Sequence, residues 1–302
     1  MKIVACGVSG LIGKHLAKAL IQKYELVRLT RRASLAAGPA GGREVLWDPR
    51  QTGGWEEEID GAYGVINLCG ASIADKRWTA KRKQELRESR VLTTRAIVNA
   101  IARAKTKPKV LVNASAVGFY GPRENTVVNE ESHGGSGFLA ELCREWEGEA
   151  QKALAFGVRV VCVRTGIVLA REGGALAKMT PPFKMGIGGP LGSGKQIMSW
   201  VHIEDEVGAI LRVVEDASLS GPVNLTAPHP VTMRELARSL GRVMKRPSFF
   251  PVPGFALRIL LGEMSEMLLT GQNAAPLKLI HSGFRFKFEN LEPALKDLLT
   301  TP

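Results

Sequence analysis

The sequence lacks a long hydrophobic run and has few cysteines. Arg, Lys, Gly or Pro interrupts every apolar stretch well before the roughly 18 residues that a bilayer-spanning helix needs. The first residues carry no basic segment ahead of an apolar one, so we expect no secretory signal peptide. The four cysteines are widely spaced and form no Cys-x-x-Cys pair, which predicts reduced thiols and no metal site. We therefore expect a cytoplasmic protein without a membrane partner.

Aromatic and acidic residues are also scarce. Aromatics make up 6% of the chain, and 41 Lys and Arg stand against 29 Asp and Glu, for a net charge of +12. The excess is greatest between Lys76 and Lys109, where twelve basic residues accompany two acidic ones. Such a segment binds nucleic acid, an acidic partner or cofactor phosphates, or is simply a solvated helix face. Trp78 is its only aromatic residue, which speaks against a surface for stacking bases and makes nucleic acid the least favoured partner.

What the chain does contain is the pattern of an α/β protein. Its 302 residues allow one large or two modest domains, and 45% hydrophobic residues support a packed core. Short apolar runs alternate with helical spacing as far as residue 163, which predicts an α/β fold with a parallel sheet covered on both faces by helices. The expected strands are 2–6, 25–30, 45–47, 65–69, 110–114 and 158–163, and the expected helices are 11–23, 79–104 and 138–156.

The character of the sequence changes after Gly166. Residues 171–200 are rich in glycine and predict a long functional loop. A helix at 204–215 and a strand at 223–225 are expected to return to the sheet. Short helices then predict a smaller, mixed carboxy-terminal lobe, at 232–243, 254–269 and 291–299. The predicted organisation is an α/β domain, 1–169 with return elements at about 204–226, and a second lobe formed by 170–203 and 227–302.

The glycine-rich turn Gly7-Val8-Ser9-Gly10-Leu11-Ile12-Gly13 lies between the first strand and the first helix. In that context glycines allow a tight turn and let the backbone approach a pyrophosphate, whose charge the helix N-terminus favours. The spacing is Gly-x-x-Gly-x-x-Gly rather than Gly-x-Gly-x-x-Gly. Its position at the start of an α/β chain predicts dinucleotide binding.

The second strand ends in Thr30-Arg31-Arg32. An NAD site commonly places Asp or Glu here to bind the ribose 2′-hydroxyl, whereas arginine accommodates a 2′-phosphate. No acid stands between Glu25 and Glu44. The pattern therefore favours NADP(H) over NAD, although two solvated arginines would produce the same pattern.

Ser115 and Tyr120 follow the fifth strand, at the edge where ligands of open parallel sheets bind. A serine there can hydrogen-bond a substrate oxygen, which makes Ser115 a catalytic candidate. It can also bond the backbone of its own turn, which would make its role structural.

Together these segments resemble extended short-chain dehydrogenases/reductases. Within them, the chain is similar to an uncharacterised subgroup of NAD-dependent epimerase/dehydratase-like proteins with a carboxy-terminal domain of unknown function. The superfamily motifs, in order, are the glycine turn, Asn67-Leu68-Cys69-Gly70, Ser115 to Gly121, Arg164 to Leu169, and Trp200-Val201-His202-Ile203-x-Asp205. The subgroup's traits are Trp47-Asp48-Pro49, Arg77-Trp78, Ser89-Arg90, Gly188 to Gly194 and an expected strand at Gly283-Phe284.

The resemblance implies that 1–169 is an NADP-binding, Rossmann-like domain with a doubly wound parallel sheet, and that the second lobe binds the substrate. It also assigns residues to the NADP(H) site. Those implied to hold the pyrophosphate are Gly7, Ser9, Gly10, Leu11 and Ile12. Those implied to contact the rest of the cofactor are Thr30 and Arg31 at the 2′-phosphate, Leu68 and Cys69 along the adenosine and ribose, Glu85 and Arg90 from the basic helix, and Val168 near the nicotinamide.

One departure from the superfamily concerns its Tyr-x-x-x-Lys pair, in which lysine lowers the tyrosine pKa so that tyrosine can exchange a proton with the substrate. Aligning Glu147 with the trailing glutamate of that motif places Leu139 and Cys143 where Tyr and Lys belong. Tyr120 is a candidate substitute acid, but it also matches the turn tyrosine that accompanies the serine.

Two histidines are further candidate acid/base groups. His202 matches a structural turn of the superfamily, and His133 lies in a glycine-rich loop. Neither has a spacing typical of a metal site.

Three functional hypotheses remain open. The first is an NADP(H)-binding oxidoreductase or epimerase-like enzyme of unknown small-molecule substrate, with Ser115 orienting the substrate oxygen and another group supplying the proton. The second is a catalytically silent NADPH-binding regulator or scaffold, which the missing pair favours. The third is nucleic-acid binding through the 76–109 segment. The 79–104 helix could also form a homodimer, although its charge argues against a dry interface.

Overall fold

The computed structural model describes residues 1–31 and 41–300. Its centre is a seven-stranded, wholly parallel sheet with the order β11-β7-β5-β4-β1-β2-β3. The strands are β1 (Lys2–Cys6), β2 (Glu25–Thr30), β3 (Arg43–Leu46), β4 (Gly64–Asn67), β5 (Val110–Ala116), β7 (Arg159–Thr165) and β11 (Gly221–Leu225). The strand order reverses between β1 and β4, and a ligand crevice of an open α/β sheet forms at such a point.

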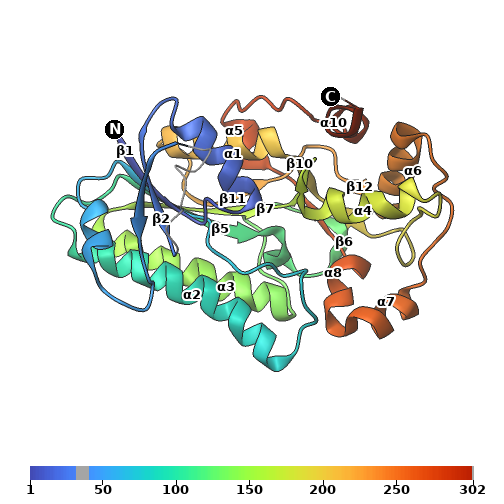
Figure 1. The fold of residues 1–302 in the computed structure, drawn as a ribbon, viewed down its shortest axis with the longest axis horizontal. Helices are drawn as coiled ribbons and strands as arrows, with labels where there is room; N and C mark the ends of the chain where they lie inside the picture. The colour runs from blue at the N-terminus through green and yellow to red at the C-terminus, as the bar shows by residue number, and fades with distance from the viewer. Residues whose placement is uncertain (32–40, 301–302) are drawn as a thin grey trace.

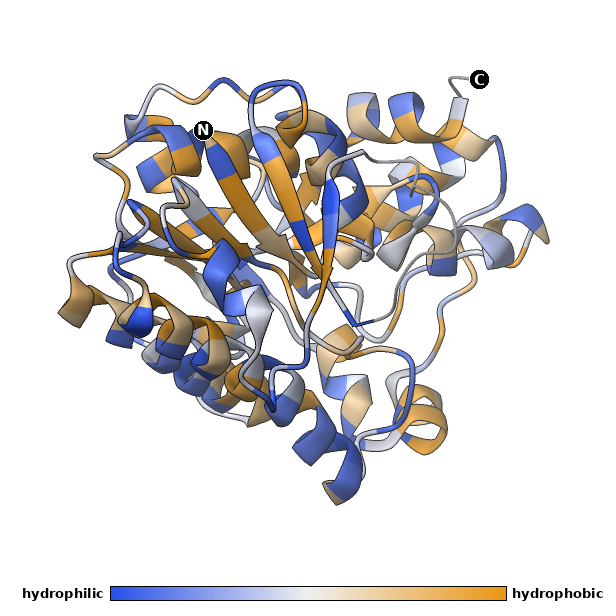
Figure 2. Ribbon diagram, turned by 60° about the vertical axis from the view of Figure 1, so that its left-hand side comes forward, coloured by the Kyte–Doolittle hydropathy of each residue, from blue (hydrophilic) through white to orange (hydrophobic). Residues whose placement is uncertain are grey.

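Helices cover both faces of this sheet (Figure 1). One face carries α1 (Leu11–Leu20) and α5 (Ile203–Glu215), and the other carries α2 (Ala80–Arg103) and α3 (Phe138–Gln151), which the 3₁₀ segment η3 (Lys152–Phe156) extends. Alternate strand residues point to opposite faces, so Ile3 packs with α1 and α5 while Val4 packs with α2 and α3. Hydrophobic colouring accordingly runs along the central strands (Figure 2). The predicted Rossmann-like, doubly wound sheet is confirmed.

The remaining elements form a smaller mixed lobe beside the carboxyl edge of the sheet. Its strands pair two by two, as β8 (Ile167–Ala170) with β10 (Trp200–His202), β9 (Ile197–Met198) with β12 (Val231–Thr232), and β6 (Arg123–Val128) with β13 (Gln272–Ala274). Its helices are α4 (Gly174–Lys184), α6 (Met233–Met244), α7 (Gly254–Leu261), α8 (Glu266–Leu269), α9 (Leu277–His281) and α10 (Leu291–Thr300). The short 3₁₀ segments are η1 (Gly54–Glu58), η2 (Val117–Tyr120) and η4 (Gly262–Ser265).

Three expectations about this lobe are wrong. The 171–200 segment is not all loop, because α4 forms there around buried Leu176 and Phe183 despite two prolines inside the helix. The 254–269 helix is interrupted at Gly262, whose φ of +61° is a left-handed conformation that ends α7. Residues 283–284 are not a strand but follow α9, with Gly283 at φ +73°. The division into two domains at residue 169 stays a prediction.

None of the helices in the described ranges combines the length and the hydrophobicity that crossing a bilayer requires.

Candidate functional site

The glycine turn after β1 depends on glycine at two positions. Gly7 has a φ of +77°, and a Cβ there would lie 2.5 Å from the Leu68 carbonyl group at the end of β4. A Cβ at Gly13 would lie 2.5 Å from the Gly7 carbonyl oxygen. The first glycine therefore lets the turn lie against the next strand, and the second lets α1 start close to it.

The N-terminus of α1 is arranged to accept an anion. Its N-cap residue, Gly10, provides no side-chain cap, and the first turn holds no acidic residue. Ser9 and Gly10 are exposed, while Leu11 and Ile12 are half-buried. Because the first backbone N–H groups of a helix need outside partners, this end suits the negative charge of a pyrophosphate.

The turn between β8 and α4, in the smaller lobe, lies against the glycine turn. A Cβ built on Gly174 would lie 2.9 Å from Leu11 Cδ2 and 3.5 Å from the Val168 carbonyl oxygen. Val168 lies half-buried on β8, paired with Val201 of β10. The structure thus brings Leu11 and Val168 to one place, as cofactor contacts at both residues require.

The end of β2 presents the candidate 2′-phosphate residues. Thr30 is half-buried and its carbonyl accepts from Trp47 N at 2.9 Å, while Arg31 directly after the strand is exposed. Leu29 pairs with Cys6, the last residue of β1, so Arg31 lies near the glycine turn. Arg32 lies outside the described residues.

The end of β4 is held by a buried amide network. Asn67 is fully buried, and its Nδ2 donates to Asn113 Oδ1 at 2.7 Å and to Thr94 Oγ1 at 2.8 Å. Its Oδ1 accepts from Cys69 N at 3.1 Å. This network fixes the turn that carries Leu68 and Cys69 along the crevice. Asn113 and Thr94 were not among the sequence-based candidates, because their pairing joins separate elements.

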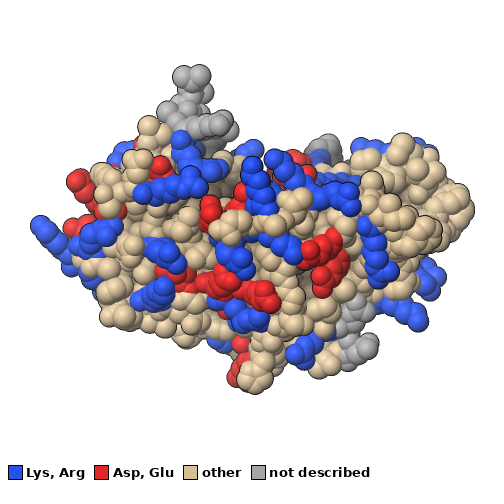
Figure 3. Space-filling model, turned by 90° about the horizontal axis from the view of Figure 1, so that it is seen from below, with Lys and Arg blue, Asp and Glu red and all other residues tan. Residues whose placement is uncertain are grey.

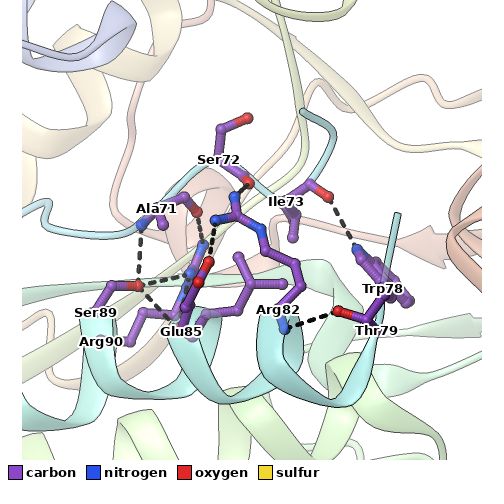
Figure 4. A network of polar contacts seen from close by, with 10 residues as sticks. Ala71, Ser72, Ile73, Trp78, Thr79, Arg82, Glu85, Ser89 and Arg90 are labelled. Carbon is purple, nitrogen blue, oxygen red and sulfur yellow. Dashed lines mark hydrogen bonds and ion pairs between the residues drawn. The ribbon is translucent and has the colours of Figure 1, made fainter. Parts of the chain in front are cut away.

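The residues after that turn are clamped to α2 (Figure 4). Arg90 donates to the carbonyls of Ala71 and Leu86, each at 3.1 Å, and Ser89 Oγ accepts from Ala71 N at 3.0 Å. The Arg90 guanidinium is buried, and this burial lowers its pKa. Arg90 therefore supports the wall of the crevice, and a direct contact with the cofactor stays a prediction.

Glu85 lies further out on the same helix. It forms an ion pair with Arg82 at 3.0 Å, and that hydrogen bond lowers the pKa of Glu85. Arg82 also donates to the Ser72 carbonyl (Figure 4). The cofactor contact of Glu85 likewise stays a prediction.

Ser115 is hydrogen-bonded to a buried ion pair. Its Oγ donates to Glu147 Oε1 at 2.6 Å, and Glu147 receives two bonds of 2.9 Å from Arg164. All three residues are buried, and the Arg164 guanidinium lies 3.4 Å from the Phe119 ring centre. Glu147 and Arg164 were not sequence-based candidates for the site, although a glutamate on the buried face of α3 is a signal that could have indicated them.

Tyr120 belongs to the same network. It is fully buried, donates to Asn224 Oδ1 at 2.7 Å and accepts from Arg164 Nη1 at 3.0 Å. Burial raises the pKa of Tyr120. A hydroxyl with both partners buried has no path to a substrate in this arrangement, so the geometry weighs against Tyr120 as the proton donor.

Leu139 and Cys143, which stand in place of the missing Tyr and Lys, both lie on α3. Leu139 is half-buried, and Cys143 is buried, which raises the pKa of the Cys143 thiol to about 11. Leu139 lines a cavity of about 60 Å³ between η2, the start of α3 and α8. Glu266 from α8 also lines it, with Oε1 3.6 Å from where a Cβ of Gly137 would lie. No sequence spacing indicated Glu266.

The two histidines have different surroundings. His202 is buried and caps α5, where Nδ1 accepts from Glu204 N at 3.2 Å and Nε2 lies 3.3 Å from Asp297 Oδ2. Its burial lowers its pKa, in keeping with the predicted structural turn. His133 is exposed. Within 1–31 and 41–300, no three His, Cys, Asp or Glu side chains come together as metal ligands would.

The parallel sheet and the glycine turn at its switch point define the class: a Rossmann-like protein with a crevice suited to a dinucleotide. Residues 3–225 match the model of the NAD dependent epimerase/dehydratase family, and residues 252–298 match a domain of unknown function, DUF1731. The chain therefore belongs to the NAD dependent epimerase/dehydratase family.

Relatives cover essentially the whole chain. An epimerase family protein of Mycobacterium leprae is 42% identical over 302 residues, covering 99% of this chain and 96% of that protein. The chloroplastic SDR39U1 homolog of Arabidopsis thaliana is 39% identical, covering 99% and 87%. Human epimerase family protein SDR39U1 (isoform 2), solved with NADPH, has a TM-score of 0.88 and 30% identity, with all of both chains covered.

Proposed function

We propose that the protein binds NADPH or NADP⁺ in the crevice at the carboxyl ends of β1, β2 and β4. The observation that carries this proposal is the uncapped N-terminus of α1 with Arg31 nearby. No acid stands between Glu25 and Glu44 to bind a free 2′-hydroxyl, as an NAD site would require. The human relative crystallised with NADPH supports it.

The chain's own residues fit this group. Gly7, Ser9 and Gly10 leave room for the pyrophosphate, and the first backbone N–H groups of α1 bind it. Thr30 and Arg31 bind the 2′-phosphate. Leu68, Cys69 and Val168 line the crevice further along. The bound cofactor supplies or accepts a hydride. With that chemistry the protein acts as an oxidoreductase or epimerase-like enzyme on a carbonyl or carbinol whose identity is open.

In this proposal Ser115 orients the substrate oxygen. Its hydroxyl hydrogen is donated to Glu147, so Ser115 accepts a hydrogen bond from a substrate hydroxyl and would have to release Glu147 before donating to a carbonyl oxygen. The proton then comes from another group, since Leu139 and Cys143 replace the usual pair. Tyr120 could serve only after releasing Asn224 or Arg164, and a Tyr120→Phe variant with unchanged turnover would remove it from the mechanism.

The second candidate is an NADPH-binding regulator without turnover. It rests on the aliphatic Leu139 and the buried, protonated Cys143 at the catalytic positions. Tight NADPH binding with no absorbance change against a panel of carbonyl substrates would favour it.

Partners and location follow as proposals. The basic charge of α2 is largely met by acids, in the pairs Arg82–Glu85, Lys83–Glu263, Arg87–Glu145, Arg95–Glu149 and Arg103–Glu56. This pairing supports a small-molecule partner over nucleic acid, and it leaves a homodimer through α2 open. Four free cysteines support a cytoplasmic location.

The test is calorimetric titration with NADPH, NADP⁺, NADH and NAD⁺. We expect the phosphorylated forms to bind more tightly, and Arg31→Ala to remove about tenfold or more of that preference, because a charge-assisted bond contributes roughly 1.5–3 kcal/mol. Arg285→Ala, which removes another exposed arginine, is the control and should leave the preference intact. Equal binding of all four forms contradicts the arginine argument, and no binding contradicts the dinucleotide site.

A further inference from the structure

Two segments of the smaller lobe carry positive charge without any acid. Residues 173–203 and 236–262 together contain eight Lys and Arg and no Asp or Glu. Among the described residues, two of the eight form ion pairs with acids outside these segments, Lys178 with Asp75 and Arg242 with Glu292. Unlike the charge of α2, most of this charge therefore faces solvent, and it marks a surface suited to an anionic partner.

The same segments expose large apolar side chains. They are Ile187 at 55% exposure, Phe249 at 71%, Phe250 at 45%, Phe255 at 66%, Ile259 at 74% and Leu260 at 69%, here called the apolar patch. Only Leu257 of α7 is buried, and the hydrophobic colouring of this helix shows at the lower right in Figure 2. Exposed apolar groups gathered in this way mark an interaction surface.

Backbone pairing brings the two segments together. Phe250 N donates to the Gly188 carbonyl at 3.1 Å, and Val252 N donates to the Pro190 carbonyl at 3.0 Å, so Ile187 lies next to the two phenylalanines. The Phe249 and Phe250 rings are 4.6 Å apart. Phe255 is five residues further on, which limits its backbone to about 18 Å from Phe250.

The basic side chains border this patch. Arg238, Arg242, Lys245 and Arg246 surround one shallow depression of about 460 Å³ together with Phe249. Lys184 and Arg246 line a neighbouring hollow of about 430 Å³, and Arg258 is exposed on α7 itself. In the view from below, the right-hand end of the molecule shows a broad uncharged area bordered by Lys and Arg (Figure 3).

We propose that this surface docks on an anionic lipid bilayer. Apolar side chains can enter the interface between headgroups and acyl chains while the surrounding Lys and Arg attract anionic headgroups. A second copy fits less well, because a symmetric interface would bring the same basic residues against each other. The expectation of no membrane partner came from the lack of a spanning segment, which does not bear on binding to one leaflet.

The test is co-sedimentation of the full chain with vesicles of phosphatidylcholine, alone or mixed with phosphatidylglycerol. We expect binding to the mixed vesicles that is about tenfold or more tighter than to the neutral ones and that weakens with added salt. Three double variants should each lose about tenfold or more: Phe249→Ser with Phe250→Ser, Phe255→Ser with Ile259→Ser, and Lys245→Glu with Arg246→Glu.

Matched controls change similar side chains elsewhere. Leu154→Ser removes another apolar side chain, 57% exposed, and Lys105→Glu reverses another exposed charge, and both should bind as the wild type does. Circular dichroism checks that each variant is folded. The proposal is overturned if wild type binds neither vesicle, if it binds both equally, or if the variants bind unchanged. A dimer in light scattering that Phe255→Ser with Ile259→Ser dissociates would assign the patch to a second copy instead.

Discussion

At the scale of single residues, the carboxylate of Glu147 organises the inner end of the site. It is bonded by Ser115 and by two Arg164 nitrogens, and Arg164 in turn reaches Tyr120. Ser115 is thus held in one rotamer, which would position a substrate oxygen, whereas Tyr120 is committed to the interior. In the proposed function, Ser115 rather than Tyr120 is therefore the residue expected to contact the substrate.

Removing the charge of Glu147 should destabilise the protein strongly. Glu147→Gln leaves the buried Arg164 guanidinium without its counter-charge, at a cost of about 3–5 kcal/mol in the free energy of unfolding. Glu145→Gln on the same helix breaks the surface pair with Arg87, whose partners are 43% and 35% exposed, and should cost less than about 1 kcal/mol. Urea denaturation measures both, and similar losses would contradict the role given to Glu147.

The buried carboxyl of Glu206 gives a pH dependence of stability. Burial raises the pKa of Glu206 to about 8, and its Oε1 accepts from Thr165 at 2.8 Å. Between the unfolded value near 4.5 and this folded value, the native state binds the extra proton, so stability falls as pH rises. The stabilisation is fully present below the unfolded pKa and is lost as pH rises through the folded one.

Glu206→Gln removes this titration and keeps a side-chain oxygen for Thr165. Its free energy of unfolding relative to wild type should therefore increase from pH 5 to pH 8, by up to about 1.4 kcal/mol per pH unit. Chemical denaturation across that range measures it. Parallel curves for the two proteins would show that Glu206 has an ordinary pKa in the folded state.

Sequence patterns identified the residues whose roles depend on their neighbours along the chain. They missed the residues whose roles depend on contacts between distant elements. Gly7 and Gly13 were predicted because strand, turn and helix are consecutive, and Arg31 because it ends a strand. Glu147, Arg164 and Asn224 contact one another or Tyr120 only where α3, β7 and β11 meet, so the local sequence does not reveal these contacts. The same holds for Glu266, which reaches the α3 cavity from α8.

At the scale of elements, α2 is a support for the crevice as much as a charged surface. Arg82, Ser89 and Arg90 bond the 71–72 backbone that follows the Leu68-Cys69 turn (Figure 4). These basic and polar residues of α2 therefore hold the backbone beside the crevice, a role that the net charge of the helix does not indicate.

Loosening the clamp should weaken cofactor binding. Arg90→Ala removes both carbonyl contacts, so amide exchange at residues 70–73 should speed up and NADPH affinity should fall by about tenfold. Arg87→Ala, one turn earlier on the helix, is the control because its partner is the surface residue Glu145. Unchanged exchange at 70–73 in Arg90→Ala would contradict the clamp.

Long regular elements were predictable, and irregular ones were not. The strands β1, β2 and β4 and the helix α2 follow from continuous apolar runs or sustained helical spacing. By contrast, β6 pairs with β13 across more than a hundred residues of chain, as in the partners Val128 and Ala274. Helix α4 forms around two prolines because Leu176 and Phe183 are buried there, a tertiary effect that overrides the local signal.

At the scale of the whole molecule, the unpaired positive charge of the described residues and the hydrophobic core are distributed differently between the dinucleotide domain and the smaller lobe. The acids that pair with α2 offset much of the charge of that helix, whereas residues 173–203 and 236–262 of the smaller lobe hold eight Lys and Arg and no acid. The hydrophobic core does not divide in this way. One cluster of buried side chains contains Ile3 and Leu16 from the dinucleotide domain together with Leu240 and Leu295 from the smaller lobe.

Because that cluster is shared, the two predicted domains should unfold as one unit. Differential scanning calorimetry should show a single transition, and NADPH at about 100 times its dissociation constant should raise the free energy of unfolding of the whole molecule by about 2.7 kcal/mol. NADH at the same concentration is the control and should have a smaller effect, since it lacks the 2′-phosphate that Arg31 is proposed to bind. Two transitions, of which only one moves with NADPH, would instead show that the smaller lobe folds independently and that the division at residue 169 is a thermodynamic boundary.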